Sequence, residues 1–270
     1  MTPEILLIHI MKTAGTSLRR MVTDGLGPEA VYPNDDDLDQ RRRGWYPGTH
    51  ELLDDVRAER THDARLLVGH VPYVLADALD PRPLTVALLR DPVARSVSML
   101  EHRRTRRGRH RGATYQELLE DEELVARQVR DYQTKVFAFD TLDECPGDVN
   151  VPLEIDEARF ERAVARLEQV TVLGVVEDLP AFASRLERVA AIPVGEERRD
   201  NRSSGSRPDV APEVIERIEE LTRRDRELYQ CALELTGDRP GGHGPQRRLW
   251  PPARWGWRNP VDRRNSAGRR

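Results

Sequence analysis

A buried strand followed by a lysine-containing turn and a helix is the feature that most constrains this chain. Residues 5–10 form a short, largely apolar run, which is typical of a strand buried on both faces of a parallel sheet. The chain then turns, and its pattern predicts a helix over residues 17–24. The first N–H groups of such a helix have no partner within it and point, with the positive end of the helix dipole, at the turn. The segment therefore predicts a site for a phosphate or a similar anion.

The turn itself supplies further donors: Lys12, Thr13, Ala14, Gly15, Thr16 and Ser17. Gly15 allows close approach of the backbone, the hydroxyl groups add donors, and Lys12 adds a full charge. Lysine plus arginine total 43, yet lysine occurs only at Lys12 and Lys135, which favours a compact ammonium here. The G-x-x-x-x-G-K-[ST] loop of nucleotide triphosphatases has its lysine after the glycines, so the order in this chain argues against that loop. An ordinary turn with a solvated lysine is the alternative.

A second strand, residues 84–89, ends in Arg90 and is followed by another predicted helix. Asp91 is a good N-cap and Pro92 suits the first helical turn. Arg90 then lies at the carboxyl end of a strand, where open α/β sheets bind ligands, and Ser98 lies two turns into the helix. A guanidinium fork matches phosphate oxygens, and a serine hydroxyl can complete the contact. The alternative is a capped helix in which Arg90 pairs with a surface acid.

The two segments together resemble the sulfotransferase superfamily, in particular the branch of the heparan and uronyl 2-O-sulfotransferases and related bacterial enzymes. The family's P-K-T-[AG]-[GS]-T-S loop, which binds the 5′-phosphosulfate of 3′-phosphoadenylyl sulfate (PAPS), is similar to residues 11–17, with Met11 in place of proline. Its R-D-P-x-x-R-x-x-S segment, which binds the 3′-phosphate, is matched by residues 90–98. The resemblance implies a P-loop-like sulfotransferase fold, metal-independent chemistry, and cofactor contacts from Lys12, Thr13, Ala14, Gly15, Thr16, Ser17, Arg90 and Ser98.

The resemblance also indicates a base. Residues 66–73 read as a short strand ending in Gly-His-Val-Pro-Tyr, and the 2-O-sulfotransferases have their catalytic histidine in a similar segment. His70 is the residue at that position, and a neutral imidazole is suited to accept a hydroxyl proton near pH 7. Lys12 is expected to offset charge on the leaving phosphate. His9, on the first strand, is expected to pack in the core.

Two weaker segments also resemble the family. Residues 132–137 are similar to an N-x-Q-T-[RK] segment near acceptor and cofactor, without its asparagine, which makes Gln133 and Lys135 candidate substrate contacts. Asn201 and Ser203 lie in an N-x-S loop that covers the adenine and 3′-phosphate in the family; a polar loop with capping residues is an equal alternative.

Strands alternating with helices predict an α/β fold with a doubly wound, mainly parallel sheet. Residues 1–236 are expected to form one domain, with a surface excursion at about 32–62, and residues 237–270 a poorly ordered Pro/Gly/Arg-rich tail. Strands are expected at 5–10, 66–69, 84–89 and 170–176, and helices at 115–139, 156–168, 179–191 and 212–235.

The net charge of -4 and the pI near 6.0 argue against a general nucleic-acid binder. The sequence has no apolar run near 18 residues and no apparent signal peptide, so a cytoplasmic location without a membrane anchor is expected. The basic run 102–111 either lines an acceptor cleft that favours an anionic acceptor or forms a solvated loop.

The predicted activity is transfer of a sulfuryl group from PAPS to an acceptor hydroxyl on a small molecule or carbohydrate, with adenosine 3′,5′-bisphosphate as product. A phosphotransferase that uses a purine triphosphate and a non-catalytic nucleotide-binding relative are the rival hypotheses. The sequence does not predict the acceptor or the oligomeric state.

Overall fold

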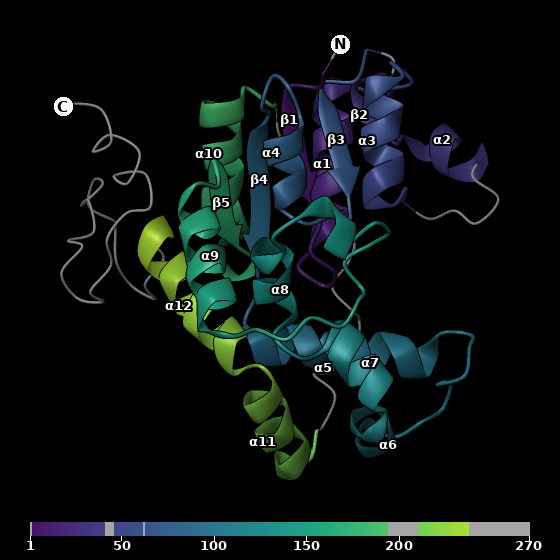
Figure 1. The fold of residues 1–270 in the computed structure, drawn as a ribbon, viewed down its shortest axis with the longest axis vertical. Helices are drawn as coiled ribbons and strands as arrows, with labels where there is room; N and C mark the ends of the chain where they lie inside the picture. The colour runs from purple at the N-terminus through teal and green to yellow at the C-terminus, as the bar shows by residue number, and fades with distance from the viewer. Residues whose placement is uncertain (1, 41–45, 62, 194–209, 238–270) are drawn as a thin grey trace, which may run out of the picture.

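A five-stranded, all-parallel sheet forms the centre of the computed structural model, which describes residues 2–40, 46–61, 63–193 and 210–237 (Figure 1). The strand order is β2-β3-β1-β4-β5. The strands are β1 (Ile5–Ile8), β2 (Val31–Tyr32), β3 (Leu66–Gly69), β4 (Leu84–Leu89) and β5 (Val172–Val175). The predicted α/β class is confirmed, and the arrangement is compatible with a doubly wound fold.

Twelve α-helices surround this sheet within the described ranges. They are α1 (Gly15–Leu26), α2 (Asp35–Gln40), α3 (Thr49–Arg57), α4 (Val74–Ala78), α5 (Pro92–Thr105), α6 (Tyr115–Glu120), α7 (Glu122–Gln128), α8 (Tyr132–Ala138), α9 (Glu157–Glu168), α10 (Leu179–Ala190), α11 (Pro212–Leu221) and α12 (Arg223–Thr236). No helix in the described part of the chain is long and apolar enough to span a membrane.

Both faces of the sheet are buried, which explains why its strands are apolar without alternation. Leu6 and Ile8 of β1 belong to a core shared with α3, α4, α8, α9 and α12. Ile5 and Leu7 belong to a second core, shared with α1 and α10. Successive side chains of a strand point to opposite faces, so each strand contributes to both cores.

The order of the strands creates a switch point between β1 and β4. The chain leaves β1 through α1 toward β2 at one edge of the sheet, and it leaves β4 toward β5 at the other edge. Connections that diverge in this way leave a crevice at the carboxyl ends of the two strands, where open α/β sheets bind ligands. Lys12 follows β1 and Arg90 follows β4, so the topology brings the two predicted anion-binding segments to the same place.

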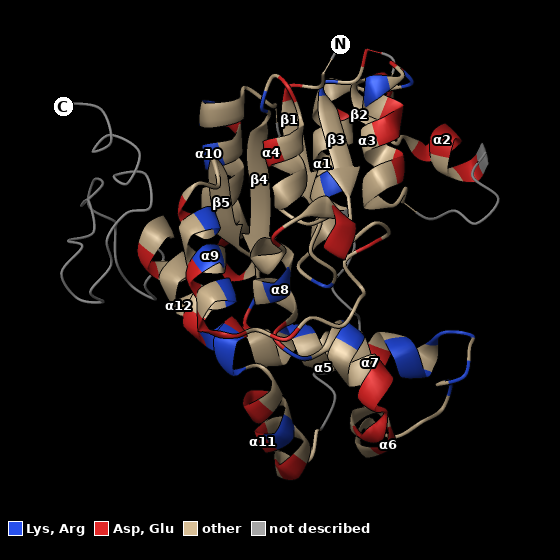
Figure 2. Ribbon diagram, viewed as in Figure 1, with Lys and Arg blue, Asp and Glu red and all other residues tan. Residues whose placement is uncertain are grey.

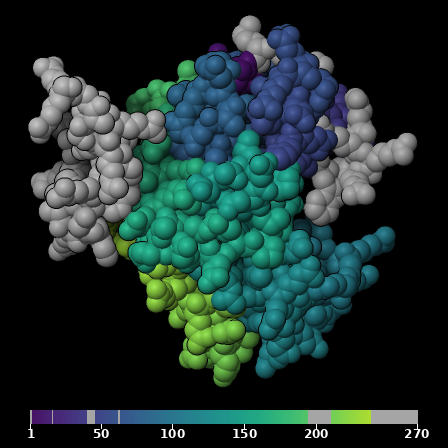
Figure 3. Space-filling view, in the orientation of Figure 1, coloured from purple at the N-terminus to yellow at the C-terminus, as the bar shows by residue number. Residues whose placement is uncertain are grey.

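A group of helices lies beyond that edge of the sheet. In Figure 1, α5, α6, α7 and α11 lie below the ends of the strand arrows. Leu100 of α5, Leu118 of α6, Val125 of α7 and Ile218 of α11 form a small core of their own. The space-filling view shows the teal segment around α8 and α9 covering the middle of the visible face, between these helices and the N-terminal part of the chain (Figure 3).

The predicted continuous helix over residues 115–139 is wrong, because three short helices occupy this range. Asp121 ends α6 and caps α7, its side chain accepting a hydrogen bond from the N–H of Leu124 (3.0 Å). Asp131 adopts a left-handed conformation (φ 41°) between α7 and α8. The apolar periodicity extends across both breaks, whereas aspartate favours caps and turns over helix interiors. In the same way, residues 212–235 form two helices that meet at Thr222.

The region predicted as a surface excursion, residues 32–62, contributes to the core in its described part. It contains the end of β2, at the edge of the sheet, and α3, whose Leu52, Leu53 and Val56 are buried in the first core. The charged runs at 35–37 and 41–43 are typical of a solvated surface, whereas the apolar residues that follow them are buried. The predicted tail, apart from Gly237, lies outside the described residues, as do Asn201 and Ser203.

Candidate functional site

The turn after β1 has an unusual backbone conformation. Lys12 (φ 70°) and Ala14 (φ 58°) are both left-handed, although neither is glycine. Such conformations cost on the order of 1–3 kcal/mol each and persist where surrounding contacts hold them. Three side chains do so by donating to successive carbonyls: Thr13 Oγ1 to Ile10 (2.8 Å), Arg95 Nε to Met11 (3.1 Å) and Arg90 Nη1 to Lys12 (3.2 Å).

Three N–H groups of the same turn are uncommitted, whereas that of Thr13 donates to the Ile10 carbonyl (3.4 Å). Helix α1 begins at Gly15, two residues before the predicted start, and its N-cap Ala14 offers no side-chain acceptor. Within the described residues, the N–H groups of Lys12, Ala14 and Gly15 have no acceptor. The arginine side chains occupy the carbonyls of Met11 and Lys12, so the N–H groups at the helix start remain available as donors to an anion.

Arg90 connects the two predicted segments. Its guanidinium lies over the turn, 3.2 Å from the Lys12 carbonyl, and no carboxylate of the described residues pairs with it. Asp91 is the N-cap of α5 as predicted, accepting from the N–H of Ala94 (2.8 Å). The alternative in which Arg90 pairs with a surface acid therefore does not match the structure.

Arg95 supports the turn through a hydrogen bond to the Met11 carbonyl. Its side chain is fully buried, lies 3.9 Å over the ring of Tyr132, and donates to the carbonyls of Met11 and Gln128. Its Nη2 is buried without a partner in the described structure. Arg95 thus ties the turn after β1 to the junction of α7 and α8.

Positive charge gathers around the Lys12 ammonium, which makes no hydrogen bond or ion pair with any described residue. Burial lowers the pKa of Lys12, and the nearby Arg95, Arg106 and Arg90 lower it further. His102 of α5 is part of the same cluster: burial, Lys12 and Arg106 lower its pKa to about 4, so it is neutral at pH 7. Unpaired cations crowded into one partly buried place favour the binding of an anion.

His70 directly follows β3, and its ring packs against His9, whose own ring lies against Gly15. Its ring is 4.6 Å from the ring of His9 and 4.9 Å from that of Tyr46, centroid to centroid. Its Nε2 is buried without a partner in the described part of the chain, and its carbonyl accepts from the N–H of Val149 (3.0 Å). Burial lowers the pKa of His70 to about 4, and the negative charge of Asp148 opposes this shift. The imidazole is therefore neutral at pH 7.

Gln133, a predicted substrate contact, holds the backbone of Arg90 instead. Its side-chain amide accepts from the Arg90 N–H and donates to the Arg90 carbonyl, both at 2.9 Å. Asp225 of α12 in turn accepts from the N–H groups of Gln133 (3.1 Å) and Thr134 (2.7 Å) at the start of α8. In this structure Gln133 positions Arg90 rather than facing an open site.

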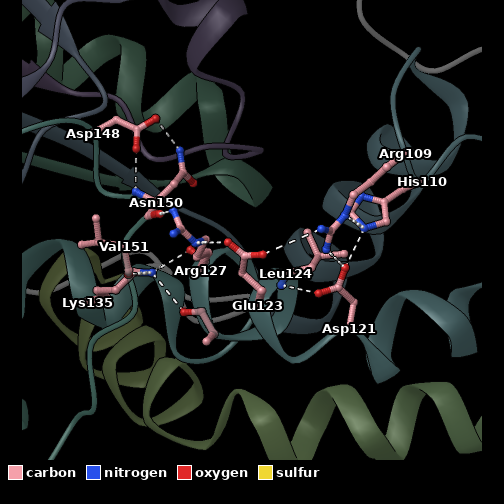
Figure 4. A network of polar contacts seen from close by, with 11 residues as sticks. Arg109, His110, Asp121, Glu123, Leu124, Arg127, Lys135, Asp148, Asn150 and Val151 are labelled. Atoms are coloured by element: carbon pink, nitrogen blue, oxygen red, sulfur yellow. Dashed lines mark hydrogen bonds and ion pairs between the residues drawn. The ribbon is translucent and has the colours of Figure 1, made fainter.

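Lys135, the other predicted substrate contact, is fully buried. Its ammonium donates to the carbonyls of Arg127 (2.6 Å), Val151 (2.8 Å) and Ala126 (3.4 Å). Figure 4 shows this amine joined, through Arg127 and Asn150, to the loop that carries Asp148. The amine thus holds the loop beside His70 in place and has no surface open to an acceptor.

The basic run 102–111 was predicted either to line an acceptor cleft or to form a solvated loop, and different residues of the run match each description. His102 and Arg106 lie near Lys12. Arg104 instead pairs with Glu101 (3.1 Å), and Arg109 and His110 both contact Asp121 (Figure 4). Figure 2 shows the arginines of this run in blue on α5 and the loop after it, beside the acidic residues of α6 and α7. One side of the run therefore faces the candidate site, and the other forms surface ion pairs.

The remaining predicted cofactor contacts differ in what the structure says of them. The Thr13 hydroxyl is buried and used within the turn. Ser17 is partly buried on α1, and Ser98 is partly buried on the face of α5 that also carries Arg95 and His102. The side chain of Thr16 lies outside what the structure describes.

Sequence reasoning missed four members of the site: His9, Tyr46, Asp148 and His102. His9 is buried, as expected, but against His70 and the turn rather than within the apolar cores. His102 could have been found, because Arg95, Ser98 and His102 recur at helical spacing. Tyr46 and Asp148 come from irregular segments whose sequence carries no such periodic signal.

No model of a known protein family matches this sequence, and a search among curated proteins finds no match either.

Proposed function

We propose that this protein is a sulfotransferase with a P-loop-like fold, which moves a sulfuryl group from PAPS to an acceptor hydroxyl. The observation that carries the proposal is the contact between Arg90 Nη1 and the Lys12 carbonyl at 3.2 Å. It joins, at the switch point of the sheet, two segments that each offer uncommitted donors. A cofactor with phosphate groups at two positions needs both.

The donor set fits such a cofactor. The free N–H groups of Ala14 and Gly15, at the start of α1, would hold the 5′-phosphate end, and Lys12 would offset charge that grows on the leaving oxygen. Arg90 and Ser98 would hold the 3′-phosphate. When bound, PAPS supplies the activated sulfuryl group, and adenosine 3′,5′-bisphosphate is the product.

His70 would take the acceptor's proton. Its imidazole is neutral at pH 7, and its Nε2 is not committed to any described group. Burial makes it a weak base in the free protein. Negative charge held at the Lys12 turn would raise the pKa of His70, because a nearby anion stabilises the imidazolium form. The base would therefore become stronger when the cofactor site is filled.

Nucleotide binding separates this proposal from its rivals. We expect adenosine 3′,5′-bisphosphate without magnesium to stabilise the protein against heat more than Mg-ATP does. A preference for Mg-ATP would support a phosphotransferase. Stabilisation by the bisphosphate, with no transfer of labelled sulfate from PAPS to any component of a metabolite extract, would support a non-catalytic relative.

The base assignment is tested by His70→Ala. Transfer should be abolished while the affinity for the bisphosphate stays within a few-fold, since the imidazole contacts the acceptor and not the nucleotide. Full turnover in the variant would remove His70 from the mechanism.

A further inference from the structure

His9 lies beside two parts of the chain that contribute to the candidate site, the turn at residues 12–15 and the segment that carries His70. It directly follows β1, and its N–H donates to the carbonyl of Gly69 (2.9 Å), the residue before His70. Its ring lies 4.6 Å from the ring of His70 at an angle of 56°. The ring of Tyr46 packs edge-on against the His9 ring at 5.6 Å and lies 4.9 Å from the His70 ring. His70 is therefore in contact with both His9 and Tyr46.

The His9 ring also lies against the first residue of α1. A methyl group added to Gly15 would come within 1.9 Å of His9 Cδ2 and 2.0 Å of its Nε2. The three atoms nearest to that position all belong to the His9 ring. Glycine is therefore required at residue 15 because of this imidazole, and the ring fixes how closely α1 approaches the end of β1.

Burial is the largest influence on the pKa of each ring. Burial lowers the pKa of His9 well below its ordinary value, and His70, Arg19 and Lys12 lower it further. Asp148 is the charged group that acts on His70. Tyr46, whose own pKa is raised by burial, is the remaining titratable group against both rings. At pH 7 the two neighbouring rings are both neutral.

We propose that His9 is a positioning residue that holds the imidazole of His70 and the start of the anion-binding turn at one fixed separation. The role rests on the proposed function, because it matters when a proton acceptor and an anion site must act on one reacting group. The same ring contacts the base and lies against Gly15. Any shift of the ring therefore moves one half of the site relative to the other, and a misplacement of about 1 Å can lower turnover on the order of a hundredfold.

The first experiment compares His9→Ala with His9→Phe, using NMR titration of His70 as the readout. Alanine opens space beside His70, so its pKa should rise by about one unit or more toward the ordinary value. Phenylalanine keeps an apolar ring there, so the pKa should stay low. Phe182→Leu, which alters the buried contact with Gly174 on β5, serves as a control for general destabilisation and should leave the His70 titration unchanged.

The second experiment is a double-mutant cycle on binding of adenosine 3′,5′-bisphosphate. Gly15→Ala alone should weaken binding about tenfold or more, because the new methyl group displaces the His9 ring or α1. Adding His9→Ala removes the obstacle, so the double variant should bind at least about threefold more tightly than Gly15→Ala.

The proposal is overturned if the two substitutions act independently on binding, or if His9→Ala leaves the His70 pKa in place. Neither the NMR titration nor thermal stability of the cycle variants depends on turnover. If the protein proved not to be a sulfotransferase and did not bind the bisphosphate, the rescue of Gly15→Ala by His9→Ala would still appear in the free energy of unfolding. The failure of the function and the failure of this role are therefore distinguishable.

Discussion

The turn that carries Lys12 and the pocket that encloses Lys135 are two ammonium sites built in opposite ways. Lys12 is partly exposed, makes no contact with an acceptor among the described residues, and is crowded by arginines. Lys135 is fully buried and donates to three carbonyls. Burial lowers the pKa of both, to about 7 for Lys135.

The difference shows what a rare residue type indicates. These are the only two lysines among 43 basic side chains. Three carbonyls converging on one point suit a compact ammonium and not a planar guanidinium, so the structure explains lysine at residue 135 by packing alone. At Lys12 no described residue accepts from the ammonium, so packing does not explain the lysine there, and the proposed cofactor would. The surroundings of the amine distinguish a structural lysine from a candidate ligand-binding lysine, whereas the residue type alone does not.

Lys12→Met is expected to have the largest effect, and it should act on activity rather than on stability. We expect transfer of sulfate to fall about 100-fold to 1,000-fold, as when a donor that stabilises developing charge is removed. The free energy of unfolding, from urea titration, should not fall, because the lost ammonium has no partner in the free protein. Normal turnover would place Lys12 outside the site.

Lys135→Met should act on stability instead. Three carbonyls lose their donor in a buried place, so the free energy of unfolding should fall by about 2 kcal/mol or more. Lys135→Arg should not restore it, since the larger fork does not fit the same three oxygens. A variant as stable as the parent but impaired in turnover would return Lys135 to the acceptor site that its sequence context suggested.

Arg90→Ala tests the ligand contact proposed beside the Lys12 turn. Hydrogen bonds to a charged group contribute about 1.5–3 kcal/mol, so affinity for adenosine 3′,5′-bisphosphate should fall at least about tenfold. Affinity for an analogue without the 3′-phosphate should fall much less. Isothermal titration of both ligands checks this, and equal losses would argue against a 3′-phosphate contact.

The buried Lys135 is expected to make the free energy of unfolding depend on pH. The folded pKa of Lys135 is about 7 and its ordinary value is 10.5, so between these values the unfolded chain binds more protons than the folded one. Its contribution to the free energy of unfolding therefore rises with pH, by up to about 1.4 kcal/mol per unit. Burial raises the pKa of Cys145 and Cys231 to about 11, which has the opposite effect above about pH 9.

The measurement is urea unfolding at pH 7, 8 and 9 for the parent protein and Lys135→Met. The parent should gain stability with pH relative to the variant. Identical slopes in the two proteins would mean that the amine titrates alike in the folded and unfolded states.

Ser98→Ala should give the smallest effect. Loss of one neutral donor to the 3′-phosphate corresponds to about 1 kcal/mol, or roughly fivefold in bisphosphate affinity. An analogue without that phosphate should bind the parent and the variant equally, and a loss with both ligands would indicate a disturbed helix α5.

Much of the fold could be predicted from local sequence. β3 and β4 have the predicted bounds, because each is a short apolar run between clear breaks. The Asp91 cap and the strand-turn-helix after β1 were predicted for the same kind of reason. The breaks within 115–139, the edge strand β2 and the buried face of α3 were not, since their apolar spacing is ambiguous until their neighbours in space are known.

The sequence by itself determined the parallel sheet and the two donor segments at its carboxyl edge, because strand periodicity, helix starts and charge are local properties. Only the tertiary structure decided that Gln133 and Lys135 support the backbone, and that His9 rather than an apolar residue packs against both His70 and Gly15. Those roles depend on which carbonyls and rings meet across distant parts of the chain. Tertiary packing determines which groups come into contact, and the same residue types can make either a ligand contact or a structural one.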